Sequence, residues 1–104
     1  MRKNLTLLAA LLCISTATAQ EITRVACVGN SITYGSGIVN RPLNSYPAQL
    51  STYLGEGYQV ENFGVGGTTT LSQGDHPYIK TQEYAQSLAF NPDIVILKLG
   101  TNDS

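Results

Sequence analysis

The chain has 104 residues, of which 42% are hydrophobic, and a formal net charge of −1 at pH 7. It contains no stripe of basic residues to neutralise phosphates, so the charge pattern argues against nucleic-acid binding. Cys13, Cys27 and the single histidine, His76, do not cluster at metal-ligand spacing, and we therefore expect no metal and no other cofactor.

Residues 1–19 have the pattern of a secretory signal peptide. Arg2 and Lys3 form a short basic region, residues 5–14 form an apolar run, and Ala17-Thr18-Ala19 has the small-x-small pattern that signal peptidase recognises. The alternative is a buried first helix, but the run is short and its flanks are those of a signal. We expect cleavage near Ala19, a secreted or periplasmic product, and no membrane attachment after cleavage.

The first predicted element after this segment is a strand over Ile22–Val28, which ends at Gly29. Apolar residues occupy both faces near its end, which is typical of an interior strand of a parallel sheet. Cys27 lies in this run, so we expect a packed and inert thiol. Residues 30–44 are predicted as a loop, and Ser45 is predicted to cap a helix that ends at Gly55 and Gly57.

A second strand is predicted over Tyr58–Phe63, a helix over Ile79–Phe90, and a third strand that opens with Ile94–Leu97 and ends at Leu99-Gly100. Strands that alternate with helices indicate an α/β fold with a parallel sheet and helices on its faces. The carboxyl ends of parallel strands lie at one rim of the sheet, where open α/β sheets bind their ligands. We therefore expect the polar loops after the three strands to meet at this rim.

The first of these loops holds Gly29-Asn30-Ser31-Ile32-Thr33. A serine hydroxyl at the end of a strand becomes a nucleophile when a base takes its proton and NH groups stabilise the oxyanion. The plainer interpretation is that Ser31 caps the segment that follows.

The second loop, residues 64–70, contains Gly66 and Gly67, whose backbone NH groups can approach a ligand closely. The alternatives are a flexible turn or a phosphate loop, although the spacing of the known phosphate motifs is not met. In the third loop the Asn102 amide can donate to an oxyanion, or Asn102 and Asp103 can form an ordinary turn in which Asp103 accepts backbone NH groups.

Taken together, the three loops resemble the SGNH (GDSL-like) hydrolase family. The matching blocks are residues 26–33, 62–67 and 99–103, in the family's order and spacing. The resemblance implies a three-layer α/β/α domain of flavodoxin-like style, of which residues 20–104 would be the N-terminal part. It also implies catalytic roles for the following residues: Ser31 as nucleophile and oxyanion NH, Gly67 as oxyanion NH with Gly66 as the alternative register, and Asn102 as side-chain oxyanion donor.

Within the family, residues 29–33 and 74–78 are most similar to bacterial carbohydrate acetylesterases, including sialate O-acetylesterase-like proteins. Many members have Asp where this chain has Asn30. The family also carries its catalytic His, with an Asp three residues earlier, in a late block that these 104 residues do not contain. His76 directly follows Asp75, an arrangement poorly suited to a triad, so we expect His76 to line the rim or lie on the surface.

These observations predict a secreted serine esterase that deacetylates a small-molecule or carbohydrate ester through an acyl-enzyme, and a chain that is an incomplete fragment of it. One alternative is an inactive or carbohydrate-binding protein of the same fold. A second is a Gly-loop nucleotide-binding α/β protein, which the near-miss motifs and the signal pattern disfavour. The sequence does not predict an oligomeric state.

Overall fold

The computed structural model describes residues 21–103, and a parallel three-stranded sheet forms its centre. The strands are β1 (Thr23–Gly29), β2 (Tyr58–Gly64) and β3 (Ile94–Lys98), in the order β2-β1-β3. The predicted parallel sheet with an interior first strand is therefore confirmed. The predicted signal peptide and its cleavage site near Ala19 lie outside the described residues.

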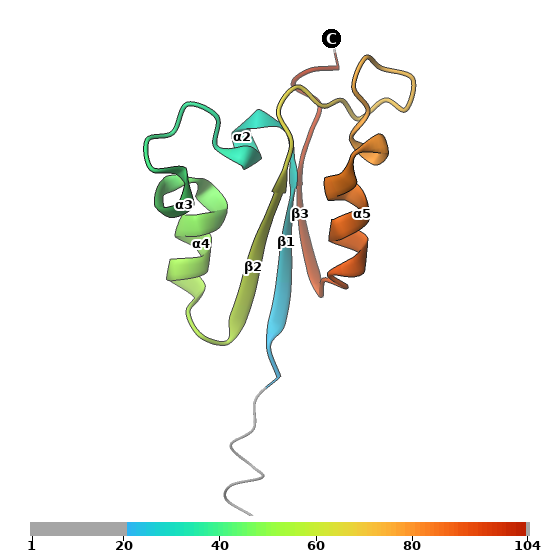
Figure 1. Cartoon of the computed structure of the whole chain (residues 1–104). Coiled ribbons are helices and arrows are strands. Elements are labelled where there is room, and N and C mark those ends of the chain that lie inside the picture. The colour runs from blue at the N-terminus through green and yellow to red at the C-terminus, as the bar shows by residue number, and fades with distance from the viewer. Residues whose placement is uncertain (1–20, 104) are drawn as a thin grey trace, which may run out of the picture.

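Helices cover both faces of the sheet. In Figure 1, α4 (Tyr46–Leu54) lies on one side of the strands and α5 (Gln82–Ala89) on the other. Both helices contact β2, and α5 also contacts β1. The result is the three-layer α/β/α arrangement that the order of elements and the family resemblance predicted.

The strands end level with one another, which brings the loops that follow them to one rim. Gly29 lies opposite Gly64 on β2 and opposite Lys98 on β3 in the sheet register. The backbone NH of Asn30 then donates to the Lys98 carbonyl, and that of Val65 donates to the Gly29 carbonyl. The upper end of Figure 1 shows this rim, where the C-terminus also lies.

The prediction of a loop over residues 30–44 was wrong in part, because two short helices lie within it. They are α2 (Ser31–Tyr34) and α3 (Arg41–Asn44). The side chain of Asn30 accepts from the Ile32 NH and begins α2, while a proline at the start of α3 suits the first turn of a helix. Helices of four residues are too short to show a periodic apolar pattern, so they could not be predicted from hydrophobic periodicity.

The helix predicted over residues 79–90 is also divided. A 3₁₀ turn, η1, spans Tyr78–Lys80, and α5 begins only after Thr81. The Thr81 hydroxyl oxygen accepts a hydrogen bond from the Tyr84 NH, so Thr81 is the N-cap of α5. Ser45 stands at the N-cap position of α4 as predicted, but its side chain makes no capping bond there.

The buried core is small and centred on β1. Val25, Ala26 and Cys27 are no more than 2% exposed. Burial raises the pKa of the Cys27 thiol to about 11, which agrees with the expected packed and inert cysteine. By contrast, every residue of β3 is exposed, and its four apolar side chains at positions 94–97 are between 36% and 64% exposed.

Candidate active site

Ser31 is the first residue of α2, directly beyond the central strand, and it is partly buried. The capping hydrogen bond of this helix comes from Asn30, whose Oδ1 accepts from the Ile32 NH at 3.1 Å. The alternative in which Ser31 itself caps the segment therefore does not describe this turn. Asn30 therefore carries out the capping in place of Ser31.

The end of α2 packs tightly against the end of β2. A Cβ on Gly64 would overlap the backbone of Tyr34, so only glycine permits this approach. The Asn62 amide Nδ2 donates to the Thr33 carbonyl at 2.9 Å, and Asn62 Oδ1 accepts from the Gly64 NH at 2.9 Å. These contacts hold the serine-bearing turn against the second strand.

The loop after β2 brings Gly66 beside the serine. An ideal Cβ on Gly66 would lie 3.8 Å from Ser31 Cβ and 3.8 Å from Ser36 Oγ. Gly67 has φ of +79°, a left-handed conformation that favours glycine. Thr68 is fully buried, and its hydroxyl donates to the Val65 carbonyl at 2.8 Å, so the loop is held from within.

The loop after β3 is tied to the same segment by two side chains. The Asn102 amide Nδ2 donates to the Thr68 carbonyl at 3.0 Å. An amide nitrogen has two hydrogens, so the second remains available to another acceptor. The Asp103 carboxylate accepts from the Thr70 NH at 2.9 and 3.1 Å and from the Leu71 NH at 3.0 Å.

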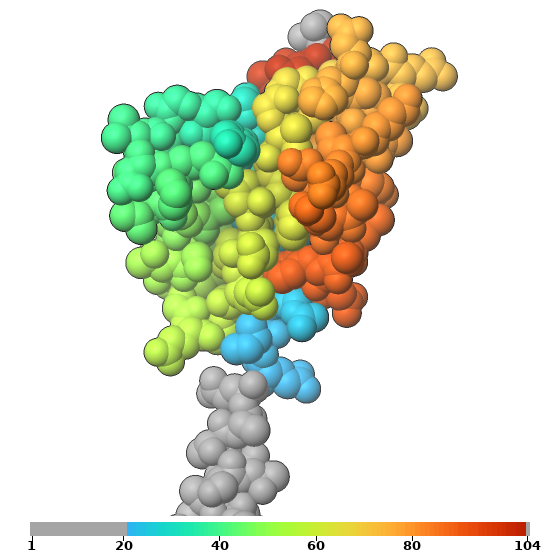
Figure 2. Space-filling model, in the orientation of Figure 1, coloured from blue at the N-terminus to red at the C-terminus, as the bar shows by residue number. Residues whose placement is uncertain are grey.

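The hydrogen bonds from Thr70, together with that from Leu71, lower the pKa of Asp103 below its usual value. Asp103 thus ties down the loop by accepting backbone NH groups. Figure 2 shows the segment after β2 and the residues after β3 gathered at one end of the molecule.

His76 also lies at this rim. Its Nδ1 atom is 3.9 Å from the position that a Cβ on Gly67 would occupy, and its side chain is exposed. The neighbouring Asp75 is exposed too. The expectation that His76 lines the rim therefore agrees with the structure.

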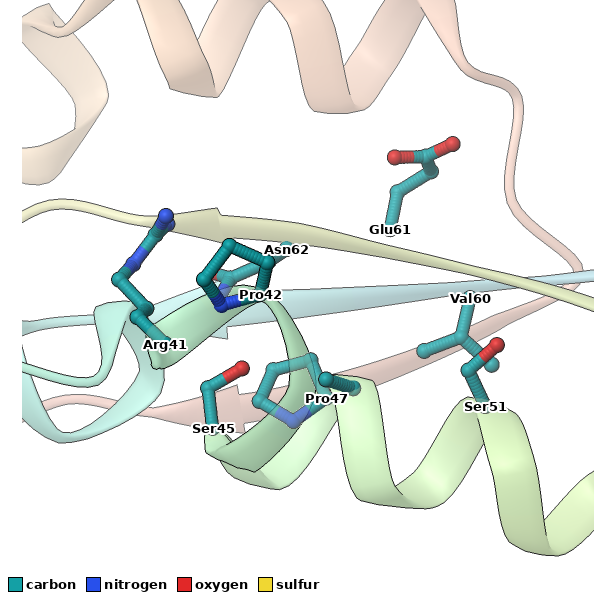
Figure 3. Close-up of a pocket in the computed structure, with 9 residues that line it drawn as sticks. Arg41, Pro42, Ser45, Pro47, Ser51, Val60, Glu61 and Asn62 are labelled. Atoms are coloured by element: carbon teal, nitrogen blue, oxygen red, sulfur yellow. The ribbon is translucent and has the colours of Figure 1, made fainter. Parts of the chain in front are cut away.

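One hollow in the described part of the chain lies away from these loops. It has a volume of about 190 Å³ and lies between α3 and α4 on one side and β2 on the other (Figure 3). Arg41, Ser51 and Val60 are among its lining residues, and none of the predicted site residues is.

Residues 21–103 hold no cluster of three or more histidine, cysteine, aspartate or glutamate side chains that could ligate a metal ion. Among the same residues, no helix has the length and apolar character needed to cross a bilayer.

Sequence reasoning missed two residues that shape this site. Asn30 orients the serine turn through its cap, and an asparagine just before a short helix was an available signal. Thr68 accepts the hydrogen bond from Asn102, 34 positions along the chain. Nothing in the local sequence indicates a contact between residues so far apart.

Comparison with known proteins agrees with this geometry. The sequence model of the GDSL-like lipase/acylhydrolase family matches residues 27–104. An acetylxylan esterase of Xylanibacter ruminicola is 53% identical over 88 residues, which are 85% of this chain and 18% of that protein. The chain thus spans about a fifth of the length of this curated relative. No solved structure matches it significantly. With the loops that follow all three strands inside the matched residues, the chain belongs to the GDSL-like lipase/acylhydrolase family.

Proposed function

We propose that this protein is a carbohydrate acetylesterase that works through a serine acyl-enzyme. The observation that carries the proposal is the convergence of three loops: Gly66 lies beside Ser31, and Asn102 is hydrogen-bonded to Thr68 next to Gly67. A nucleophile flanked by NH donors is the arrangement that acyl transfer requires. The similarity to an acetylxylan esterase supports an acetylated sugar as substrate.

In the proposed first step, Ser31 Oγ attacks the ester carbonyl carbon while its proton passes to a histidine base. The developing oxyanion accepts hydrogen bonds from the backbone NH of Ser31, the backbone NH of Gly67 and the Asn102 amide. The tetrahedral intermediate then collapses, the sugar oxygen leaves with the proton from the histidine, and acetyl–Ser31 remains. Water attacks this ester in the same way and releases acetate.

Asn102 is well placed for this role because one of its two amide hydrogens is used to fix its orientation. The bond to Thr68 holds the amide in place, and Thr68 is fully buried in a loop that Asp103 also anchors. A donor that is already oriented costs little reorganisation when charge develops, which is the basis of oxyanion stabilisation.

The base in this proposal is a histidine–aspartate pair outside residues 21–103, in the late block that the family resemblance implies. His76 is not assigned this role. Its Nδ1 faces Gly67, whereas a triad histidine needs an acid at the nitrogen remote from the serine. We further propose that residues 20–104 are the N-terminal part of the hydrolase domain and that the signal-like segment directs export.

Two other functions are less well supported. A carbohydrate-binding protein without catalysis would have no need for the backbone and amide donors around Ser31. A nucleotide-binding loop is disfavoured by the family match and by the near-miss motifs in residues 64–70.

Titration with an active-serine phosphonate tests the proposal. The full-length protein should be labelled with one equivalent, on Ser31, and should release acetate from acetylated xylo-oligosaccharides. Ser31→Ala should abolish both reactions. Ser72→Ala is the matched control, because Ser72 is an exposed serine in the long loop of the same rim. Labelling elsewhere, or nucleotide binding without labelling, would contradict the proposal.

A further inference from the structure

His76 has an exposed side chain on a firmly held backbone. The Thr69 NH donates to the His76 carbonyl at 2.9 Å, and the Tyr78 NH donates to the Thr69 carbonyl at 3.0 Å. Residues 69 and 77 thus form a parallel bridge. Tyr78 is 2% exposed, and its hydroxyl donates to the Phe63 carbonyl at 2.6 Å.

These bonds fix the backbone of His76 beside the loop after β2, although its side chain is open to solvent. An exposed histidine on a mobile loop would have no defined place at the rim. Here the imidazole has a defined place, because the segment on its C-terminal side is buried and the carbonyl of His76 and the NH of Tyr78 are both hydrogen-bonded to Thr69.

The imidazole lies beside Gly67, one of the two glycines in the loop after β2. The Nδ1 atom of His76 is 3.9 Å from the position that a Cβ on Gly67 would occupy. Ser31 Cβ and Ser36 Oγ are each 3.8 Å from the position that a Cβ on Gly66 would occupy. Ser31 and His76 therefore flank neighbouring positions of one loop. A molecule bound at Ser31 with its carbonyl oxygen at the Gly67 NH would have His76 beside it.

The chemistry of an acetyl ester decides which part of the substrate reaches His76. The acyl group ends in one methyl, which lies close to the carbonyl carbon and fills little space. The alcohol part is a sugar ring several times larger, and it must extend outwards through the open side of the rim. An exposed imidazole can donate a hydrogen bond to a sugar hydroxyl, accept one from it, and pack its ring against the sugar C–H groups.

We infer that His76 is a specificity-determining residue that contacts the sugar of the leaving group. This inference rests on the proposed acetylesterase function and adds to it a subsite on the Gly67 side of Ser31. Its ligand class is a pyranose ring with free hydroxyl groups next to the acetylated one. The role is separate from proton transfer, so it changes the preference for the alcohol part and leaves the chemistry at Ser31 unchanged.

The test compares two acetate esters in the full-length protein. One is an acetylated xylo-oligosaccharide, and the other is 4-nitrophenyl acetate, whose leaving group has no sugar hydroxyls. His76→Ala should lower kcat/KM for the sugar ester about five- to tenfold, mostly through KM, as expected for the loss of one exposed hydrogen bond. Hydrolysis of 4-nitrophenyl acetate should stay within about twofold, since the nucleophile and its donors are untouched.

Two further variants sharpen the result. His76→Gln keeps a hydrogen-bonding group at this place and should recover part of the sugar preference. Lys80→Ala replaces an exposed side chain on η1, four positions further along, and should behave as wild type on both substrates.

The possible outcomes separate the two proposals. An equal fall on both esters, or no change on either, would overturn the role of His76 while leaving the esterase intact. A loss of about a thousandfold or more on both esters would make His76 the base and would likewise overturn the subsite. Absence of any Ser31-dependent turnover by the wild type would overturn the proposed function and the subsite together.

Discussion

Replacement of Asn102 by alanine separates two roles that the structure combines in one side chain. The amide ties the loop after β3 to the loop after β2 through the Thr68 carbonyl, at 3.0 Å. In the proposed mechanism it also donates its second hydrogen to the oxyanion. The first role acts on stability whether or not substrate is present, and the second acts on the transition state alone.

The expected magnitudes of the two effects differ. Removal of the donor leaves the carbonyl of a fully buried residue without its partner, which should cost about 1–2 kcal/mol of unfolding free energy. Loss of one preorganised oxyanion donor costs about 3 kcal/mol at the transition state, so kcat should fall roughly 100-fold. Since the variant stays mostly folded, the stability loss cannot account for the fall in kcat.

The assay measures chemical denaturation and acetate release on the same preparations of the full-length protein. Thr101→Ala is the matched control, because Thr101 is exposed and adjacent and its hydroxyl meets only Lys98 Nζ, at 3.5 Å, in the described part of the chain. If Asn102→Ala loses the expected stability but keeps kcat within about fivefold of wild type, the amide only joins the loops and the oxyanion role is refuted.

Three further results are expected. Gly67→Ala should lower the free energy of unfolding by about 1–2 kcal/mol, measured by chemical denaturation, because φ of Gly67 is +79°. Gly66→Ala should lower it much less, because a Cβ on Gly66 would make only ordinary contacts at 3.8 Å. Equal losses in the two variants would count against this reasoning. The lowered pKa of Asp103 stabilises the folded state at pH values above the usual value of 3.8, so the free energy of unfolding should fall as the pH drops through the folded pKa. Asp103→Asn should remove this part of the acid dependence. An unchanged pH profile of stability in this variant would refute the prediction. Residues 21–104 alone should show no cooperative thermal transition, because the apolar side chains of β3 are 36–64% exposed; a sharp transition with esterase turnover would refute that prediction.

The strands were predicted well from the sequence, and the short helices were not. The apolar run that ends at Gly29 and the run at positions 94–97 carry enough hydrophobicity to indicate strands, and both boundaries were within two residues. The helices α2 and α3 depend on single capping residues and on packing against β2, and such features leave no periodic signal. The break at Thr81 depends on one hydroxyl, which a window of helical periodicity overlooks.

For the candidate site, the residue types and their places at strand ends could be predicted, but their contacts could not. Ser31, Gly67 and Asn102 follow three strands of one parallel sheet, and parallel topology alone brings such residues to one rim. The bond from Asn102 to Thr68 and the clamp of Asp103 on the Thr70 and Leu71 NH groups required the folded chain. The structure assigned the capping role to Asn30 rather than Ser31, although the asparagine before the turn was a signal present in the sequence.

The sequence by itself determined the class of fold and the kinds of group at the rim, because hydrophobic periodicity and glycine placement act over a few neighbouring residues. The tertiary structure decided which of these groups meet. It placed His76 beside Gly67, through a bridge between the backbones at positions 69 and 77. It also left β3 as an exposed apolar edge in the described part of the chain. Contacts of this kind depend on sheet register and loop closure between distant segments, which local sequence patterns do not encode.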